Sequence, residues 1–202
     1  MKRHVTQGLS RYRNRRDFKQ SPEPHRTPRQ NLKRKNRFVI QKHAARNLHY
    51  DFRLQVGNVL KSWAVPKGPS INPADKRLAI PTDDHPLAYA TFEGVIPKDN
   101  YGAGVVMVWD IGTYKNITKH DGKAISMARG YREGHLEFEL YGKKLRGKFA
   151  LVQTESKYKG KQYWLLVKMR DTHEDRRRKP IVSQQRSVLT DRTMDQIKRD
   201  ES

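Results

Sequence analysis

Two histidines, an aspartate and an arginine fall within eleven residues of the segment QKHAARNLHYDFRL (residues 41–54). Imidazole nitrogens and carboxylate oxygens bind divalent transition metals, and a guanidinium binds phosphate through paired hydrogen bonds. His43, His49 and Asp51 therefore form a candidate metal set with open positions for water or a phosphate oxygen. Arg53 is a candidate phosphate ligand beside them. The donor types suit manganese, iron or zinc alike.

The strict alternation in HYDFRL predicts a β-strand that would position these groups. Side chains two apart share a face, so His49, Asp51 and Arg53 point together, opposite an apolar face that we expect to turn inward. In a regular strand His43 would lie about 20 Å from His49. A turn near AAR (residues 44–46) must then bring it back. The alternative is an ordinary strand whose polar face is half-exposed.

Two further positions could carry chemistry. His85 precedes Pro86, which favours an extended or turn conformation, and a histidine there is a candidate general acid or base or a surface side chain without a catalytic role. Lys119 begins KHDG, a pattern in which nucleic-acid ligases carry an adenylated lysine. Only about 80 residues follow it, so we expect a polar β-turn there instead.

The composition limits the partners and the compartment. The chain has 202 residues, 43 Lys and Arg against 21 Asp and Glu, and a formal charge of +22, which indicates a polyanionic partner. Nucleic acid is the first candidate and an anionic membrane surface the second. No apolar run is long enough to span a bilayer, and no signal peptide is apparent. We therefore expect an intracellular protein. The absence of cysteine excludes disulfides and thiolate metal sites.

The chain divides into three parts by pattern. Residues 1–35 carry 12 basic and 2 acidic side chains with three prolines, which predicts a basic N-terminal arm. Residues 36–171 hold many short β-rich runs separated by Gly, Pro, Asn or Asp, typical of an all-β barrel or sandwich. Residues 172–202 read as a charged linker and a short helix capped by Thr190 or Thr193, which we expect to be an appendage rather than part of the core.

Several segments, in one order along the chain, resemble the 3′-phosphoesterase domain of bacterial and archaeal DNA ligase D, from about Arg16 to Asp171. The matching segments are RDFKQSPEP, FVIQKHAARNLHYDFRL, LKSWAVPKGPS, KRLAI, DHPLAYATFEGVIP, YGAGVVMVWD and KLRGKFALV. The resemblance implies an all-β fold with a compact, closed or nearly closed β-barrel. It also implies a divalent metal cofactor, preferably Mn²⁺, with other divalent transition metals possible.

The resemblance also implies roles for individual residues. His43, His49 and Asp51 match the metal ligands, and Arg53 and His85 match groups that engage the scissile phosphate and its transition state. Asp17 and Glu23, the only acids of the arm, match residues required for catalysis, so the arm is expected to fold partly onto the site. Substrate-binding positions are implied with less defined roles at four residues: Arg16, Lys67, Arg77 and Tyr89.

The function implied is the end processing of non-homologous end joining, the removal of 3′-terminal ribonucleosides and 3′-phosphates from DNA or primer strands to leave a ligatable 3′-hydroxyl. The expected partners are 3′ ends of DNA or RNA–DNA primer-templates, with a separate DNA ligase, a polymerase and a break-binding protein, and no membrane. We expect a stand-alone, cytoplasmic and nucleoid-associated enzyme. The alternatives are a non-catalytic nucleic-acid-binding β-barrel, which the charge alone would explain, and a ligase fragment that uses Lys119.

Overall fold

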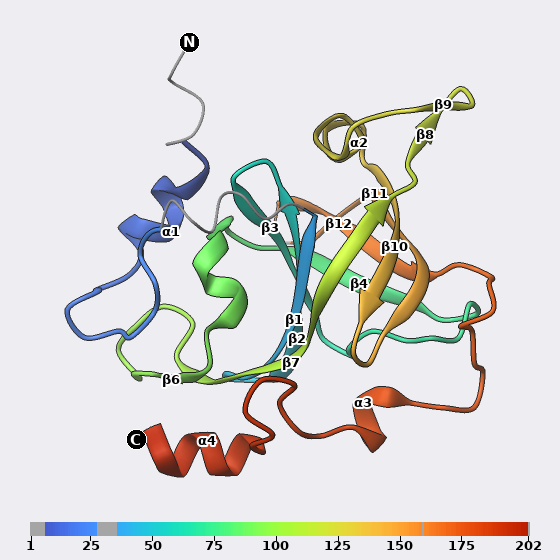
Figure 1. Cartoon of the computed structure of the whole chain (residues 1–202). Coiled ribbons are helices and arrows are strands. Elements are labelled where there is room, and N and C mark those ends of the chain that lie inside the picture. Colours follow the sequence, from blue (N-terminus) through green and yellow to red (C-terminus); the bar gives the residue numbers. More distant parts are fainter. Residues whose placement is uncertain (1–6, 28–35, 159, 202) are drawn as a thin grey trace.

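Eight antiparallel strands close into a barrel in this computed structural model, which describes residues 7–27, 36–158 and 160–201 (Figure 1). The ring closes because β1 pairs with β2 on one side and with β7 on the other. The predicted all-β barrel is therefore confirmed. Around the ring the strands follow the order β1 (Arg37–Ala44), β2 (Leu48–Val56), β3 (Val59–Val65), β4 (Lys76–Pro81), β12 (Lys161–Lys168), β11 (Arg146–Tyr158), β10 (His135–Gly142) and β7 (Gly104–Asn116).

Two hydrophobic cores lie on opposite sides of the barrel wall. The interior is filled by large apolar side chains such as Phe52, Trp109 and Phe138, all fully buried. The second core lies outside the wall, where Val39 of β1 and Leu60 of β3 pack against Tyr89 and other apolar residues. Because successive side chains of a strand point to opposite faces, each wall strand contributes to both layers. β1 and β2 are therefore buried on both faces along most of their length.

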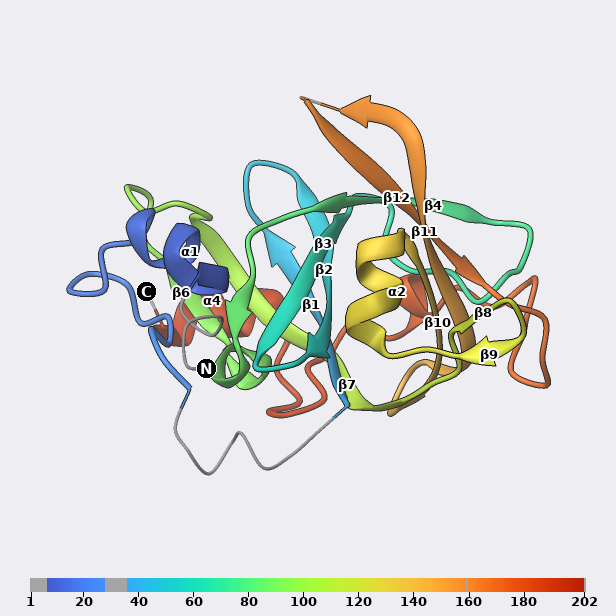
Figure 2. The same cartoon turned by 90° about the horizontal axis from the view of Figure 1, so that it is seen from above.

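Short helices and strands outside the barrel wall form an outer layer. The 3₁₀ helix η3 (Leu87–Thr91) lies between β5 (His85–Pro86), which pairs with β3, and β6 (Gly94–Ile96), which pairs with β7. The N-terminal elements η1 (Gln7–Leu9) and α1 (Ser10–Asn14) cover the same side of the barrel (Figures 1 and 2). Residues 1–6 and 28–35 of the expected arm lie outside the described residues.

The helix α2 (Met127–Glu133) connects a small hairpin to β10. The hairpin consists of β8 (Lys119–His120) and β9 (Lys123–Ala124). Ser126 caps its first turn by accepting a hydrogen bond from the backbone N–H of Arg129, as N-cap serines do. The helix ends at Gly134, whose φ of 76° places it in the left-handed region that glycine adopts without strain. The KHDG segment forms the exposed turn of the β8–β9 hairpin.

The C-terminal segment wraps one end of the barrel, with α3 (Pro180–Ser183) and α4 (Met194–Glu201). Thr193 caps α4 reciprocally, accepting from the N–H of Gln196 while the Gln196 side chain accepts from the N–H of Thr193. The expectation that this helix is a mere appendage is wrong. Ile197 is fully buried in the core that fills the barrel and Met194 packs against it, because the amphipathic helix turns its apolar side chains onto β6 and β7.

Lys144 fastens this segment to the barrel. Its ammonium donates to the carbonyls of Gln184 and Arg186 and lies 4.8 Å from the centre of the Trp109 ring. Burial lowers the pKa of Lys144 from 10.5 to about 8, despite the opposing charge of Asp110. Between those two values the unfolded chain binds more protons than the folded one, so this group makes stability rise with pH.

We expect the free energy of unfolding of a Lys144→Met variant to rise less with pH than that of the original chain between about pH 8 and 9.5. The upper pH of this range lies below the ordinary pKa of tyrosine, so that tyrosine ionisation contributes little to the slope. Denaturant unfolding at several pH values measures the difference. The control is Lys143→Met, which removes an exposed neighbour that donates to the Val188 carbonyl. An equal slope in the original chain and the Lys144→Met variant would contradict the assignment.

Among the described residues, the helices are too short and too polar for any of them to cross a membrane.

Candidate metal and phosphate site

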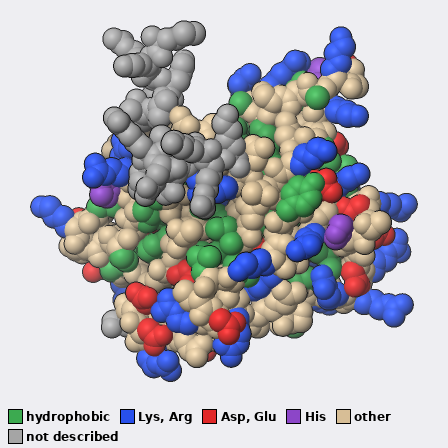
Figure 3. Space-filling view, viewed as in Figure 1, with side chains coloured by type: hydrophobic (Ala, Val, Ile, Leu, Met, Phe, Trp, Pro, Cys, Tyr) green, Lys and Arg blue, Asp and Glu red, His purple; other side chains and the backbone are tan. Residues whose placement is uncertain are grey.

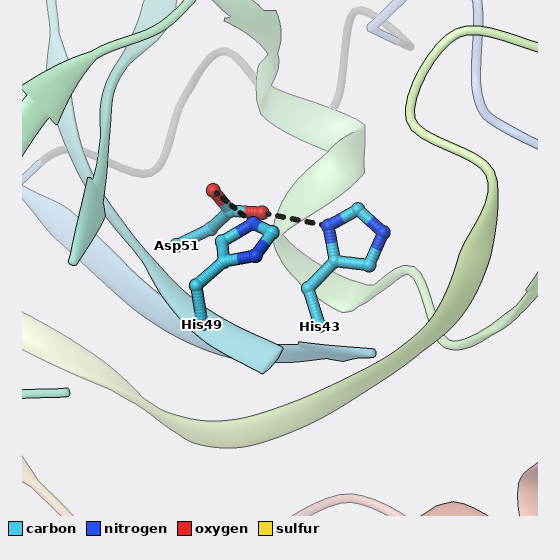
Figure 4. Close-up of side chains that lie close together, drawn as sticks. All are labelled: His43, His49 and Asp51. Atoms are coloured by element: carbon cyan, nitrogen blue, oxygen red, sulfur yellow. Dashed lines mark ion pairs between the residues drawn. The ribbon is translucent and has the colours of Figure 1, made fainter. Parts of the chain in front are cut away.

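The hairpin of β1 and β2 brings the candidate metal ligands together. Its register places His43 directly opposite His49, and residues 45–47 supply the turn that the sequence requires. Asp51 lies two positions further along β2, on the same outer face of the barrel wall. One ligand atom from each of the three residues lies within 4.8 Å of the others (Figure 4). No other group of three or more potential ligands occurs among the described residues.

The second ring nitrogen of each histidine is committed to the backbone. His43 Nε2 lies 2.9 Å from the carbonyl of Gly102, and His49 Nδ1 lies 2.9 Å from the carbonyl of Asn47. A carbonyl can only accept, so these nitrogens carry the protons and the opposite nitrogens present lone pairs. Those lone pairs face Asp51: His43 Nδ1 is 3.4 Å from Oδ2 and His49 Nε2 is 3.6 Å from Oδ1. These separations are longer than a typical hydrogen bond, and the donor set fits one divalent ion.

The electrostatics keep Asp51 ionised. Burial alone would raise its pKa, but Arg53 and the two imidazoles outweigh burial and hold the pKa well below its usual range. Burial likewise opposes the protonation of His49, yet its contacts with Asp51 raise the pKa of the imidazole. A cation bound here would compete with that proton. Asp51 is only 5% and Arg53 only 2% exposed, so the alternative of a half-exposed polar strand does not describe this face.

Arg53 is held by an extensive set of partners. Its guanidinium donates to Gln41 Oε1 at 2.7 Å, Ser62 Oγ at 2.9 Å and Asp51 Oδ2 at 3.0 Å. Nη1 also lies 2.8 Å from Nδ1 of His85. Gln41 is fixed in turn because its amide group donates to the carbonyls of Tyr89 and Phe92 in and after η3. Of the guanidinium's five N–H groups, one on Nη2 has no partner among the described residues.

His85 is buried in an aromatic and cationic environment. Its ring packs edge-on against Tyr12 and Tyr89, with centroids 4.9 and 4.6 Å away. Burial, and then the charges of Arg53 and Arg16, hold the pKa of His85 well below its ordinary value, so the imidazole is neutral at neutral pH. Nδ1 is 2.8 Å from both Arg53, which can only donate, and the Asp83 carbonyl, which can only accept. These contacts favour opposite tautomers, so the position of the ring proton depends on Arg53.

The described part of the arm closes over these residues. Arg16 donates to Glu23 Oε1 at 2.9 Å and its Nη2 lies 3.4 Å from His85 Nε2. Glu23 is buried and also accepts from the hydroxyl of Tyr89 at 3.0 Å. Tyr12 is fully buried and belongs to the hydrophobic core outside the barrel wall. Asp17 is exposed, and its backbone N–H donates to Asn100.

A pocket of about 170 Å³ joins these groups, and we call it the histidine pocket. Seven of the eleven residues predicted from sequence line it: Arg16, His43, His49, Asp51, Arg53, His85 and Tyr89. Glu23 and Asp17 lie outside the lining and connect to it through the arm. Two predicted residues are not among its described lining residues. Lys67 is exposed after β3, and Arg77 on β4 pairs with Asp75.

Several residues of the site were not singled out from the sequence. Gln41, Ser62 and Asp83 orient Arg53 and His85, and Gly102 orients His43. Gln41 lies two positions before His43 on the predicted polar face, and this spacing could have indicated it. Asp83 lies two residues before His85, whereas Ser62 and Gly102 come from distant segments whose proximity depends on strand pairing.

The sequence pattern of the DNA ligase D 3′-phosphoesterase domain family matches residues 41–153, which contain the hairpin and most of the barrel. The chain belongs to this family. The multifunctional non-homologous end joining protein LigD of Pseudomonas aeruginosa is 46% identical to it over 189 residues, which cover 92% of this chain and 22% of the relative. The LigD proteins of Mycobacterium tuberculosis and Mycolicibacterium smegmatis are 46% and 41% identical over 74% and 83% of this chain.

This member of the 3′-phosphoesterase family spans about a fifth of the length of those relatives, since it covers 22%, 19% and 21% of them. The family assignment agrees with the fold, because the matched residues 41–153 include seven of the eight barrel strands in whole or in part. It also agrees with the position of the candidate metal set at the start of the matched region.

Proposed function

We propose that this chain is a metal-dependent 3′-end phosphoesterase that removes 3′-terminal ribonucleosides and 3′-phosphates from DNA or primer strands and leaves a 3′-hydroxyl. The observation that carries the proposal is the convergence of His43, His49 and Asp51 beside a buried guanidinium and a neutral imidazole. Family membership supports the reaction class. The names of the relatives place them in non-homologous end joining, and we extend that pathway to this chain.

His43, His49 and Asp51 would hold the metal, and we assign Mn²⁺ on the family resemblance because the donor set itself accepts several divalent ions. When bound, such an ion supplies Lewis-acid polarisation of a phosphate oxygen. The protein contributes the fixed tautomers of both imidazoles, which the Gly102 and Asn47 carbonyls impose. This outer shell holds the lone pairs in place before the ion binds.

Arg53 is the proposed phosphate ligand. Four of its contacts orient the guanidinium, and the remaining Nη2 N–H is available to a non-bridging phosphate oxygen. A charge fixed in advance stabilises the negative charge that develops in phosphoryl transfer without reorganisation at that step. Gln41 is the positioning residue, since it holds the guanidinium by one end and η3 by the other.

His85 is the proposed transition-state ligand. Its depressed pKa makes it a neutral imidazole, which binds a phosphate oxygen by donating one N–H or accepts a proton at the free nitrogen. Nε2 faces Arg16, so the two groups can act on one phosphate.

The arm is proposed to complete the site, through Arg16 and Glu23 directly and through Asp17 by its attachment to Asn100. Tyr89 would orient Glu23. Lys67 and Arg77 stay proposed contacts to the nucleic-acid strand outside the pocket.

We also propose the functional division into an arm (1–35), a phosphoesterase barrel (36–171) and a C-terminal linker with helix (172–202). Packing of Tyr12 of the arm against Tyr89 and His85 supports the role of the arm in completing the site.

Glu23→Gln tests the role of the arm. We expect it to lower the free energy of unfolding by about 1–3 kcal/mol, because an amide NH₂ would face one of the donors Arg16, Ser21 and Tyr89. We expect 3′-phosphate release to fall by about ten- to a hundredfold as Arg16 loses its position. Chemical denaturation and steady-state kinetics measure the two effects. Glu155→Gln, at an exposed position of β11, is the control; equal activity of both variants would contradict the role.

The direct test of the function uses defined primer-templates ending in a 3′-phosphate or a single 3′-ribonucleotide, with a series of divalent ions. We expect inorganic phosphate and nucleoside release with Mn²⁺ and none with a chelator. Binding without release in any metal would favour a non-catalytic nucleic-acid-binding barrel, for which the positive side chains spread over the visible face in Figure 3 would be sufficient. A covalent adenylate on Lys119 would favour a ligase fragment instead.

The physiological setting is proposed from the same family. DNA ends, or RNA–DNA primer-template ends, would be the substrate, and a DNA ligase, a polymerase and a break-binding protein the partners, in a cytoplasmic, nucleoid-associated enzyme. The formal charge of +22 supports a polyanionic substrate.

A further inference from the structure

Tyr101 lies at the mouth of the histidine pocket and has no part in the mechanism above. It is one of the residues that line this pocket, and 49% of its surface is exposed. Single exposed aromatic residues are common and carry no conclusion by themselves. The position of Tyr101 is nevertheless defined by contacts of the residues that precede and follow it in the sequence.

Both neighbours of Tyr101 are attached to functional groups. The carbonyl of Gly102 accepts from the metal ligand His43, and Asn100 accepts from the backbone N–H of Asp17 in the arm. Gly102 has a φ of 85°, a conformation that glycine adopts readily and that aims this carbonyl at the imidazole. The loop between β6 and β7 therefore bridges the hairpin and the arm, and it lies beside the chain that follows α1 in Figures 1 and 2.

Two guanidinium groups lie over the ring. That of Arg15 is 5.0 Å and that of Arg16 is 5.5 Å from its centroid. Arg15 is itself partly exposed and pairs with Asp83, which also lines the pocket. A half-exposed aromatic ring in contact with cations and lining a proposed phosphate site is a combination with which proteins bind single-stranded nucleic acid irrespective of sequence.

We propose that Tyr101 is a stacking platform for the base of the nucleotide that bears the reacting 3′-phosphate. This inference rests on the proposed function and specifies how the same site recognises a nucleic-acid end. Because every base has an aromatic face, the platform favours ends that carry a base without selecting its identity. Arg15 supplies positive charge where the adjoining backbone would pass.

The experiment compares Tyr101→Ala with the original chain on two 3′-phosphate primers, one with a natural terminal nucleotide and one with an abasic tetrahydrofuran residue in its place. Stacking on an aromatic side chain accounts for roughly a five- to hundredfold effect per base. We expect a loss of that size in kcat/KM on the natural end and no difference between the two proteins on the abasic end. Tyr101→Phe should recover the loss, because it keeps the ring.

Tyr141→Ala is the matched control, since Tyr141 is 48% exposed on β10 and its hydroxyl bonds to Glu139. It should behave as the original chain on both ends. A second measurement needs no turnover: with chelator present, 2-aminopurine at the terminal position should lose fluorescence on binding the original chain and lose less on binding Tyr101→Ala.

Equal losses on natural and abasic ends, or no loss on either, would overturn the stacking proposal. Unchanged 2-aminopurine quenching in Tyr101→Ala would also overturn it. A failure of the original chain to release phosphate would overturn the proposed function, and the fluorescence measurement would still decide whether Tyr101 stacks on the terminal base.

Discussion

Replacing Asp51 by asparagine is expected to lower 3′-phosphate release by at least about a hundredfold, because the substitution removes the only charged ligand of the proposed metal set. The pKa of Asp51 is held well below its usual range, so the carboxylate is ionised throughout the neutral range and its charge is available to a cation. Asparagine has nearly the same shape, so the change acts on charge and donor type. Metal-dependent initial rates on a 3′-phosphate primer measure the effect.

Asp121→Asn is the matched control. Asp121 lies in the exposed turn of the β8–β9 hairpin with a φ of 49°, a conformation that asparagine tolerates. It should leave both activity and stability unchanged. If Asp51→Asn kept a rate within threefold of the original chain while the protein remained folded, the proposed metal set would be wrong.

Arg53→Lys is expected to lower both activity and stability, although the positive charge is kept. The guanidinium reaches Gln41, Ser62 and Asp51 from three different nitrogens, and the single ammonium nitrogen of lysine cannot take all three positions, so buried acceptors lose partners. Leaving such groups unsatisfied costs about 2–4 kcal/mol in the free energy of unfolding. The loss of a preorganised donor to the phosphate should reduce kcat by about 10²–10³. Denaturant unfolding and kinetics on the same preparations measure the two changes.

The comparison is Arg129→Lys, an exposed arginine of α2 whose Nε lies 2.6 Å from Glu133. Because exposed ion pairs contribute little, we expect a change in the free energy of unfolding below about 1 kcal/mol and full activity. Wild-type kinetics in Arg53→Lys would show that charge alone suffices at this position and would contradict the proposed role of the guanidinium geometry.

The strand alternation predicted the central part of the site for a physical reason. A period of two fixes which side chains share a face, so Asp51 and Arg53 could be placed together from sequence. The turn before His49 was required by the distance between the two histidines, and the register of β1 and β2 places them opposite each other. The closed barrel was likewise predicted from many short strands and the family resemblance, and the pairing of β1 with β7 confirms closure.

Other features depend on contacts that no local pattern encodes. Ser62 meets His85 through pairing between β3 and β5. The docking of Ile197 depends on the apolar surface formed by β6 and β7, which is absent from the helix's own sequence. The burial of Tyr12 arises in the same way, since a basic, proline-rich stretch gives no local sign of an apolar partner.

The most direct test of the account is an anomalous-scattering map at the manganese edge from crystals of the protein grown with Mn²⁺. We expect one strong peak at coordination distance from His43 Nδ1, His49 Nε2 and an oxygen of Asp51, the atoms that face one another in the hairpin. The same crystals of Asp51→Asn should lose that peak. A map with no peak between these three side chains, in a protein that still releases 3′-phosphate with Mn²⁺, would contradict the proposed site.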